Sequence, residues 1–585
     1  MNTMNRKTVR LTLAAAALAL FVAGLAPVLA NEPPTKEQLA RYRADGTLAA
    51  RIAQAKALGN HKIPQRLQAR MTSKLRALAL KNGRTPKGGA SAGDASLLAP
   101  PPAWEGMPTT GTVKVLALLI SFADYPGVTP PSTIASRLFG EGAGGPPYDS
   151  LRNFYRRSSY DQLTIEGNVL GWYQTPYTRS MVPETDNGRQ NLIKEALNYY
   201  EAQGHDFSQY DNDGDGTIDY FCVFWTGPHG EWASFWWGYY TWFYDSTYRL
   251  DGKRLTNYSW QWELYDYPNG VFTPSVIIHE TGHALGVPDY YDYDDDIGPR
   301  GGVGGLDIMD SSGDHNCFTK FMLDWIDPQV VAWGAQTVSL RASGLYPDAV
   351  LFMPGAAAGE IFDEYFMVQN RQRVGNDTNL FTASDGLLIW HVDARLNTYD
   401  TDFLYDNSYT DHKLLRLMEA DGLEEIETRA AWADAGDYYK TGSFISPESS
   451  PNTDSYDGLT TNMTLSSITG TTSPMGATVT FDAAAIFAPL DFAASRAVNS
   501  SLFLREDLNV LTWADNLVNT TVTAYRIYRL TDEGRTLVAE VPRSETGTTY
   551  LYEHWGTDPD EVYVYECVGV DAFGREGLPA TATIQ

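Results

Sequence analysis

The chain has 585 residues, of which 43% are hydrophobic and 12% aromatic, so it holds enough apolar material for several packed domains. Its net charge of −28 argues against nucleic acid or an anionic membrane as the main partner. Its three cysteines, at positions 222, 317 and 567, are too few and too scattered for a disulfide framework.

Residues 1–30 have the pattern of a secretory signal peptide. Arg6, Lys7 and Arg10 precede an apolar run at 11–25, and small residues suited to cleavage follow it. A membrane anchor is the alternative, but this run is short and the sequence has no other run of about 18 apolar residues. We therefore expect a protein without a membrane span that is secreted to the medium, the periplasm or the cell surface.

Residues 31–112 differ in charge from the rest of the chain. They hold 13 Lys and Arg against 5 Asp and Glu, whereas residues 113–585 hold 28 against 67. Their Ala/Leu/Arg-rich first part predicts helices, and the Gly/Ser/Pro-rich stretch 84–102 predicts a linker. We interpret this leader as a propeptide that inhibits its own chain, with a detachable basic arm as the alternative. It has no cysteine, which excludes a cysteine switch.

Residues 113–330 are predicted to form the catalytic domain. The run VKVLALLISF at 113–122 predicts a buried strand, and residues 150–173 predict a helix followed by a strand. Residues 189–204 predict an amphipathic helix that ends at a glycine.

An acidic loop follows, in the sequence DNDGDGTID. Four of its aspartates stand at odd spacing, with a glycine between them that permits a tight turn: Asp211, Asp213, Asp215 and Asp219. This oxygen-rich spacing is typical of a calcium loop, although Cys222 occupies the position where an EF-hand has glutamate. An ordinary Asp/Gly turn with solvated carboxylates is the alternative.

Residues 225–266 hold seven of the fifteen tryptophans of the chain. Such a density predicts a substrate cleft or a carbohydrate platform, or else the packing of strands and loops.

The stretch VIIHETGHALGVPDYYD predicts a catalytic metal site. His279 and His283 lie four residues apart, so on a helix both imidazoles point to one side, where they can share a zinc ion. Glu280 can take a proton from the attacking water. Gly286 ends the helix, and Asp289 can then return a carboxylate oxygen as the third ligand.

Several alternatives stay open at this site. A bare HExxH pattern also occurs in buried helices with two ordinary histidines. Asp292 and the acidic residues at 294–296 compete with Asp289 as the third ligand. Cys317 could supply a thiolate, but a small buried apolar residue is the preferred interpretation.

The turn GGLDIMD at 304–310 begins about twenty residues after the second histidine and carries Met309, and this resembles the metzincin arrangement. Asp289 followed by YYD, with SSYDQL and GNVLGWY upstream, resembles the immune inhibitor A-like family of secreted bacterial metallopeptidases. The resemblance implies an α+β, metzincin-like zinc peptidase domain, with a mixed sheet, an active-site helix and Met309 beneath the metal. The chain departs from metzincins because Asp289 replaces the third histidine.

The remaining sequence predicts two β-domains. Residues 331–487 contain short alternating runs that predict a β-sandwich, in which His391 is a packed core residue. The order EYFMVQNR, GLLIWHVD, MEADG in this region also resembles the same family. Residues 488–585 resemble a fibronectin type III module, with Trp513 and Tyr525 as core aromatics.

The sequence thus predicts a secreted zinc endopeptidase that also binds calcium and acts on extracellular proteins or peptides. The rival hypothesis is a secreted adhesion or glycan-binding protein with an inactive peptidase-like domain. An intact Glu280 beside a ligand trio favours the enzyme.

Overall fold

The computed structural model describes most of the chain after the predicted signal peptide. The described residues are 34–62, 107–293, 302–331, 335–352, 363–397, 403–408, 412–428, 430–458, 460–481, 486–500, 505–519, 522–531, 534–544, 548–571 and 576–584. The signal-peptide prediction and residues 63–106 of the predicted leader lie outside them. Among the described residues, no helix has the length and apolar character needed to cross a membrane.

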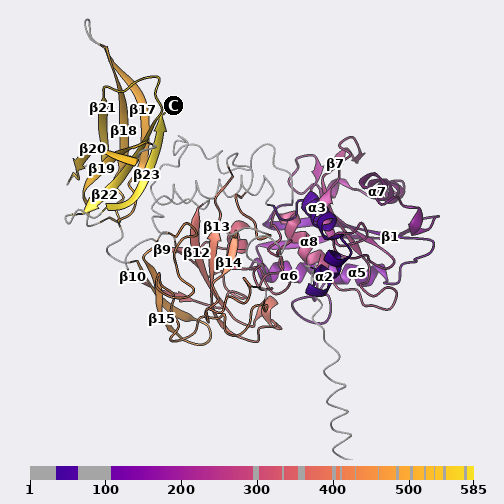
Figure 1. The fold of residues 1–585 in the computed structure, drawn as a ribbon. Coiled ribbons are helices and arrows are strands. Elements are labelled where there is room, and N and C mark those ends of the chain that lie inside the picture. The colour runs from indigo at the N-terminus through magenta and orange to yellow at the C-terminus, as the bar shows by residue number, and fades with distance from the viewer. Residues whose placement is uncertain are drawn as a thin grey trace, which may run out of the picture.

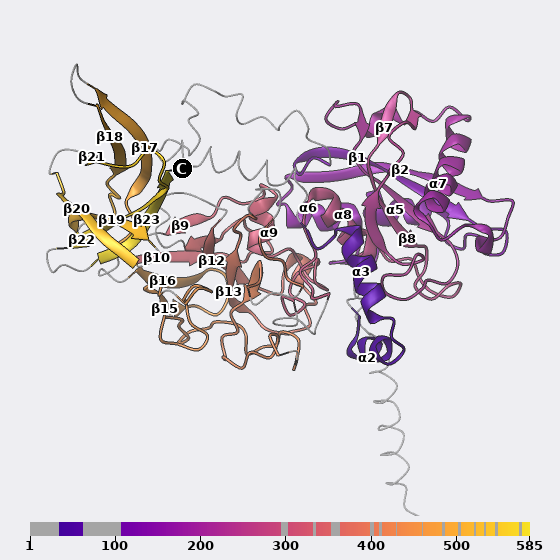
Figure 2. The same ribbon diagram turned by 45° about the horizontal axis from the view of Figure 1, so that its top comes forward.

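Two short helices form the described part of the leader: α2 (Lys36–Ala44) and α3 (Leu48–Leu58). Thr35 and Gln38 cap the start of α2 reciprocally, and Gly59 ends α3 in the left-handed conformation. Figures 1 and 2 both place α3 beside α8, the helix that carries the HExxH motif.

A five-stranded mixed sheet forms the centre of the predicted catalytic region, in the order β2-β1-β4-β8-β5. Its strands are β1 (Gly111–Ser121), β2 (Leu163–Gln174), β4 (Phe221–Trp225), β5 (Tyr239–Trp242) and β8 (Asn257–Trp262). The first four in this order run parallel, whereas β5 pairs antiparallel with β8 at the edge. Strand β1 is buried on both faces, which explains its continuous apolar sequence.

Helices surround this sheet. They are α5 (Pro131–Phe139), α6 (Leu151–Ser158), α7 (Asp186–Glu201), α8 (Ser275–Leu285) and α9 (Cys317–Met322), with one-turn helices η2 (Arg179–Met181) and η3 (Ser208–Tyr210). Helix α8 packs against β5, β8 and α6 and is buried all round, as its largely apolar sequence requires. A small sheet joins β3 (Thr217–Ile218), β6 (Arg249–Leu250) and β7 (Lys253–Leu255).

Two further sheets follow. One has the order β14-β13-β12-β11-β9 and the other β10-β16-β15. Their strands are β9 (Gln329–Val331), β10 (Ala335–Leu340), β11 (Val350–Phe352), β12 (Glu364–Arg371), β13 (Gly386–Asp393), β14 (Leu415–Leu417), β15 (Met463–Thr469) and β16 (Met475–Phe481), with a one-turn helix η5 (Gly375–Asp377).

The five-stranded sheet of this region is buried on both faces. Phe366 and Val368 of β12 pack toward the β10-β16-β15 sheet, within one hydrophobic core. Tyr365 and Met367 alternate with them and belong to the core that also contains the inner side of α8. Residues 113–330 and 331–487 therefore share a continuous core, and the predicted boundary near residue 330 does not coincide with a break in packing.

The C-terminal strands form two antiparallel sheets, with orders β17-β18-β21 and β20-β19-β22-β23. The strands are β17 (Leu490–Ser500), β18 (Arg505–Ala514), β19 (Val522–Thr531), β20 (Gly534–Pro542), β21 (Thr549–Trp555), β22 (Tyr563–Asp571) and β23 (Glu576–Ile584). Trp513 and Tyr525 lie in a hydrophobic core of their own. With its mixed sheet, helices and antiparallel sheets, the chain is α+β.

Candidate metal centre

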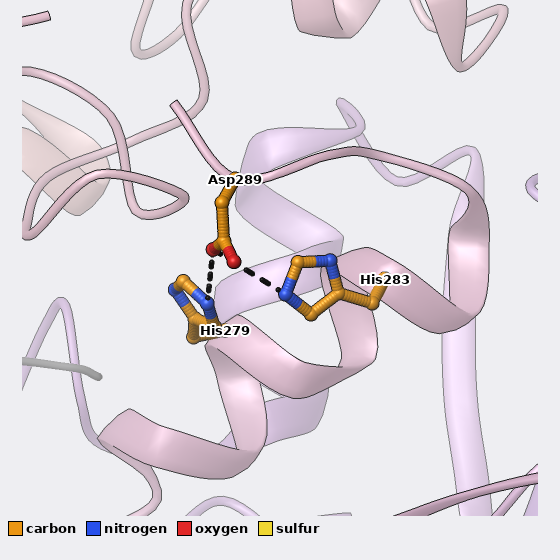
Figure 3. A group of neighbouring side chains, drawn as sticks. All are labelled: His279, His283 and Asp289. Carbon is orange, nitrogen blue, oxygen red and sulfur yellow. Dashed lines mark ion pairs between the residues drawn. The ribbon is translucent and has the colours of Figure 1, made fainter. Parts of the chain in front are cut away.

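The two histidines of α8 and the aspartate beyond it converge on one point (Figure 3). The Asp289 Oδ1 atom lies 2.9 Å from Nε2 of His279 and 3.4 Å from Nε2 of His283. One ligand atom from each residue lies within 4.8 Å of the other two, and all three side chains are buried. These distances allow a single small cation to contact all three.

Backbone carbonyls orient both imidazoles. Nδ1 of His279 lies 2.8 Å from the Ile308 carbonyl, and Nδ1 of His283 lies 2.8 Å from the Val287 carbonyl. A carbonyl oxygen can only accept a hydrogen bond, so each Nδ1 must carry the proton. The tautomer is thereby fixed, and the lone pair of each Nε2 points toward Asp289, as a metal ligand requires.

Asp289 is positioned by the end of α8 and by the turn that carries Met309. Gly286 has a φ of 104° and reverses the chain. The Tyr290 backbone N–H then donates to the Met309 carbonyl at 3.0 Å, and Tyr293 Oη donates to Asp289 Oδ2 at 2.5 Å. Burial alone would raise the pKa of Asp289, but the two imidazoles, when their Nε2 atoms are protonated in the absence of metal, hold it well below its usual value.

The chemistry of this donor set suits a metal ion. Two neutral imidazole nitrogens and one carboxylate oxygen are ligands that zinc accepts, and three protein ligands leave one position for water or substrate. Asp292 is buried in the same loop, but it does not belong to the group formed by His279, His283 and Asp289.

Glu280 lies next to the first histidine and is fully buried. Among the described residues, neither carboxylate oxygen accepts a hydrogen bond of good geometry. Burial raises the pKa of Glu280 to about 8, with His279 opposing this shift and Asp289 adding to it. A buried carboxyl group with a raised pKa beside a ligand residue fits the role of a general base.

Met309 packs directly under α8. A Cβ atom placed on Gly282 would lie 2.3 Å from Met309 Sδ, so only glycine permits this approach between the two histidines. Asp307 holds the turn, because its carboxylate accepts hydrogen bonds from the backbone N–H groups of Met309 and Asn316. Met309 therefore supports the helix.

The acidic loop brings three of its four aspartates together. Asp211, Asp213 and Asp215 each place one oxygen within 4.8 Å of the others, whereas Asp219 is not in this group. The Asp219 side chain is buried and accepts two hydrogen bonds from Asn212, and burial raises its pKa to about 7. Lys253 Nζ lies 2.6 Å from Asp211 Oδ2, so an ammonium group partly neutralises the loop.

If calcium binds to this loop, its removal at constant zinc should lower the melting temperature by about 2–4 °C, because the ion binds to the folded loop alone. Differential scanning calorimetry with and without a calcium-selective chelator measures the shift. The Asp213→Ala variant should lose it, whereas Asp206→Ala, which changes an aspartate outside the group, should keep it. Identical melting temperatures for the wild-type protein in both buffers would mean that the loop is an ordinary turn.

Most of the other residues that the sequence singles out are packed in the interior of the protein. Six of the seven tryptophans at 225–266 are buried, and Trp242 alone is exposed, at 39%. Cys317 is buried, which raises its pKa to about 12, and Asn316 caps α9. His391 stacks between Phe366 and Tyr456.

Two contacts at the centre, and one acidic group elsewhere, were not singled out by the sequence patterns. Tyr293 is a hydrogen-bond donor to Asp289, and its position after DYYD was the only signal. Asn60 of the leader accepts a hydrogen bond from the Asp289 backbone N–H, and no motif marks it. A further acidic group, Glu419, Asp421 and Asp437, includes two buried members whose pKa values burial raises to about 7.

Comparison with known proteins identifies distant relatives. No family model matches the chain. The chain is 27% identical to the pre-pro-metalloprotease PrtV of Vibrio cholerae serotype O1 over 234 residues, which are 31% of this chain and 25% of PrtV. It is 24% identical to immune inhibitor A of Bacillus thuringiensis subsp. alesti over 235 residues, which are 31% of this chain and 34% of that protein. The chain thus spans only a minor part of either relative.

These relatives confirm the resemblance to the immune inhibitor A-like family that the motifs indicate. Among solved structures, an Fn3-like protein from Clostridium thermocellum is 25% identical and covers 17% of this chain and 92% of its own. Its TM-score of 0.12 is too low to support a statement about fold.

Proposed function

We propose that the chain is a secreted, zinc-dependent endopeptidase of the metzincin-like type that hydrolyses peptide bonds of extracellular proteins. The observation that carries the proposal is the convergence of His279, His283 and Asp289 beside Glu280, above Met309. The similarity to PrtV, a named pre-pro-metalloprotease, supports it over 31% of the chain.

His279, His283 and Asp289 would hold the ion. Zinc, when bound, polarises the scissile carbonyl and lowers the pKa of the attacking water. Glu280 accepts the proton of that water and later delivers it to the leaving amine. Its buried position excludes bulk water from this transfer, and the fixed imidazole tautomers keep the ligand geometry constant during the reaction.

The substrate can pair with strand β5. This strand lies at an edge of the described central sheet and is bonded on one side to β8. Its Tyr240 ring lies 5.9 Å from the ring of His283, so the edge runs beside the metal centre. An extended peptide that adds to such an edge would be held by its main chain, which suits an endopeptidase with many substrates.

We assign residues 488–585 to a fibronectin type III-like module with a spacing or binding role. Its three-stranded and four-stranded antiparallel sheets around Trp513 and Tyr525 support this assignment. The rival hypothesis of a glycan-binding protein loses support, since six of the seven clustered tryptophans are packed inside the molecule.

Digestion of an unfolded protein tests the proposal. The processed enzyme should release internal fragments, lose this activity when a chelator removes zinc, and regain it when zinc returns. Digestion that continues without metal would exclude the proposed mechanism, and binding to glycans without any digestion would favour the rival hypothesis.

The leader should keep the precursor inactive. Residues 31–62 and the segment after them are basic, whereas the catalytic region is acidic, so exposed ion pairs should contribute to inhibition and weaken at high salt. We expect the unprocessed precursor to digest substrate more slowly than the processed enzyme, with a smaller difference at 1 M salt. Equal rates for both forms at low salt would exclude latency.

A further inference from the structure

The described part of the leader is packed into the catalytic region. Tyr42 of α2 and Leu48 and Ile52 of α3 are buried in the same hydrophobic cluster as Trp232 and Tyr293. Helix α3 packs against β5, the edge strand beside the metal centre. The leader therefore lies against the strand on which a substrate would pair.

A charged clasp anchors these helices. Arg41 and Arg51 both reach Glu231, with nitrogen–oxygen distances of 2.5 Å and 3.2 Å. Arg51 also donates to the Trp232 carbonyl at 2.7 Å and lies over the Tyr42 ring, 4.2 Å from its centre. We call Arg41, Arg51 and Glu231 the clasp. Because both arginines share one carboxylate, the clasp fixes α2 and α3 together.

After α3, the chain turns directly to the metal centre. Gly59 has a φ of 81°, and the next carbonyl, that of Asn60, accepts a hydrogen bond of 2.8 Å from the Asp289 backbone N–H. His61 follows and is only 5% exposed; its ring lies 5.5 Å from that of Tyr293, the residue that donates to Asp289. Its Nδ1 atom is buried and makes no hydrogen bond to a described residue.

His61 lies beside the centre without being a ligand. The fourth ligand of a tetrahedral ion would lie close to the other three ligand atoms. The group of ligand atoms within 4.8 Å of one another contains His279, His283 and Asp289 and does not include His61. The imidazole therefore occupies space beside Asp289 and Tyr293, where it would stand in the way of a substrate or a chelator.

We propose that Asn60 and His61 are the blocking element of the precursor, held in place by the clasp on Glu231. The proposal rests on the proposed peptidase function, because it assigns the regulation of the same centre. It also explains how a leader without cysteine can maintain latency: the backbone of Asn60 is bonded to the Asp289 loop, and the side chain of His61 fills the approach to it.

The test uses the full precursor with Glu280→Ala, so that it does not process itself. The first measurement is the rate at which 1,10-phenanthroline removes zinc. The second is deuterium uptake by the peptide that contains the Asp289 amide, which is bonded to Asn60 and needs no metal. Both measurements report how often the leader separates from the catalytic region.

We expect His61→Ala and the double variant Arg41→Ala/Arg51→Ala to release zinc about tenfold faster or more, and to exchange the Asp289 amide faster. Gln54→Ala, which changes an exposed residue of α3 outside the clasp, should behave like the parent. Arg41→Glu/Arg51→Glu should open the leader, and adding Glu231→Arg should restore part of the slow release, because all three charges of the clasp are then reversed together.

Equal zinc release and equal exchange in parent, His61→Ala and clasp variants would overturn the blocking role, while the peptidase function would stand. A parent precursor that binds no zinc would instead contradict the proposed function, and the exchange measurement would still show whether Asn60 protects the Asp289 loop.

Discussion

Asp289→Ala should be purified with little zinc, whereas the wild-type protein should carry about one ion per chain. The two imidazoles are fixed by backbone carbonyls, but two ligands alone hold zinc weakly. Asp289 supplies the third donor, since its Oδ1 atom lies within 3.4 Å of both Nε2 atoms. Removal of the carboxylate also leaves two buried histidines without their anionic partner. Metal analysis of the purified variant measures the loss.

Asp292→Ala is the matched control, because Asp292 is a buried carboxylate in the same loop that lies outside the ligand group. It should retain zinc. Asp289→His should recover part of the zinc with a changed pH dependence, because an imidazole must lose its proton before it binds a metal. Full zinc in Asp289→Ala, or its loss only in Asp292→Ala, would show that another carboxylate is the third ligand.

Glu280→Ala should retain zinc and fold while losing proteolysis by about 100-fold or more, which is the contribution of a positioned general base. The structure places no metal-ligand role on Glu280, since the group of converging ligand atoms does not include it. The substitution removes a carboxyl group that is not a ligand, so zinc binding should be unaffected. The value of kcat/KM on an internally cleaved peptide measures the effect.

Glu263→Gln controls for the loss of a buried charge. Glu263 is a buried carboxylate that accepts hydrogen bonds from the backbone N–H groups of Val128 and Thr129, outside the metal-binding group. Its neutralisation should affect stability more than the rate per zinc-loaded molecule. Near-normal activity of Glu280→Ala would exclude the proposed mechanism.

The local elements of the fold were largely predictable. The apolar run of β1 has the length and composition of a buried strand. Helix α8 has helical periodicity and a glycine at its end, so the sequence predicts both elements. The shared core was not predictable, because Tyr365 and Met367 look like ordinary strand residues, and only the arrangement of the sheets shows that their face packs toward α8. The role of the tryptophans at 225–266 could not be predicted for a similar reason, since their burial depends on contacts between distant segments.

The candidate site also divides into parts that local sequence predicts and parts that depend on distant segments. His279, Glu280 and His283 are predictable because helix geometry alone brings i and i+4 together. Asp289 follows from the glycine turn after the helix. The contact of Asn60 with the Asp289 loop has no pattern in the sequence, since a backbone carbonyl forms it and any residue could supply one.

Wild-type and Glu280→Ala proteins, processed identically and measured side by side for bound zinc and for digestion of an unfolded protein, test the central claim most directly. We predict about one zinc ion per chain in both and internal fragments from the wild type alone. Equal digestion by both proteins, or digestion by a wild-type protein that holds no zinc, would contradict the assignment of a zinc endopeptidase.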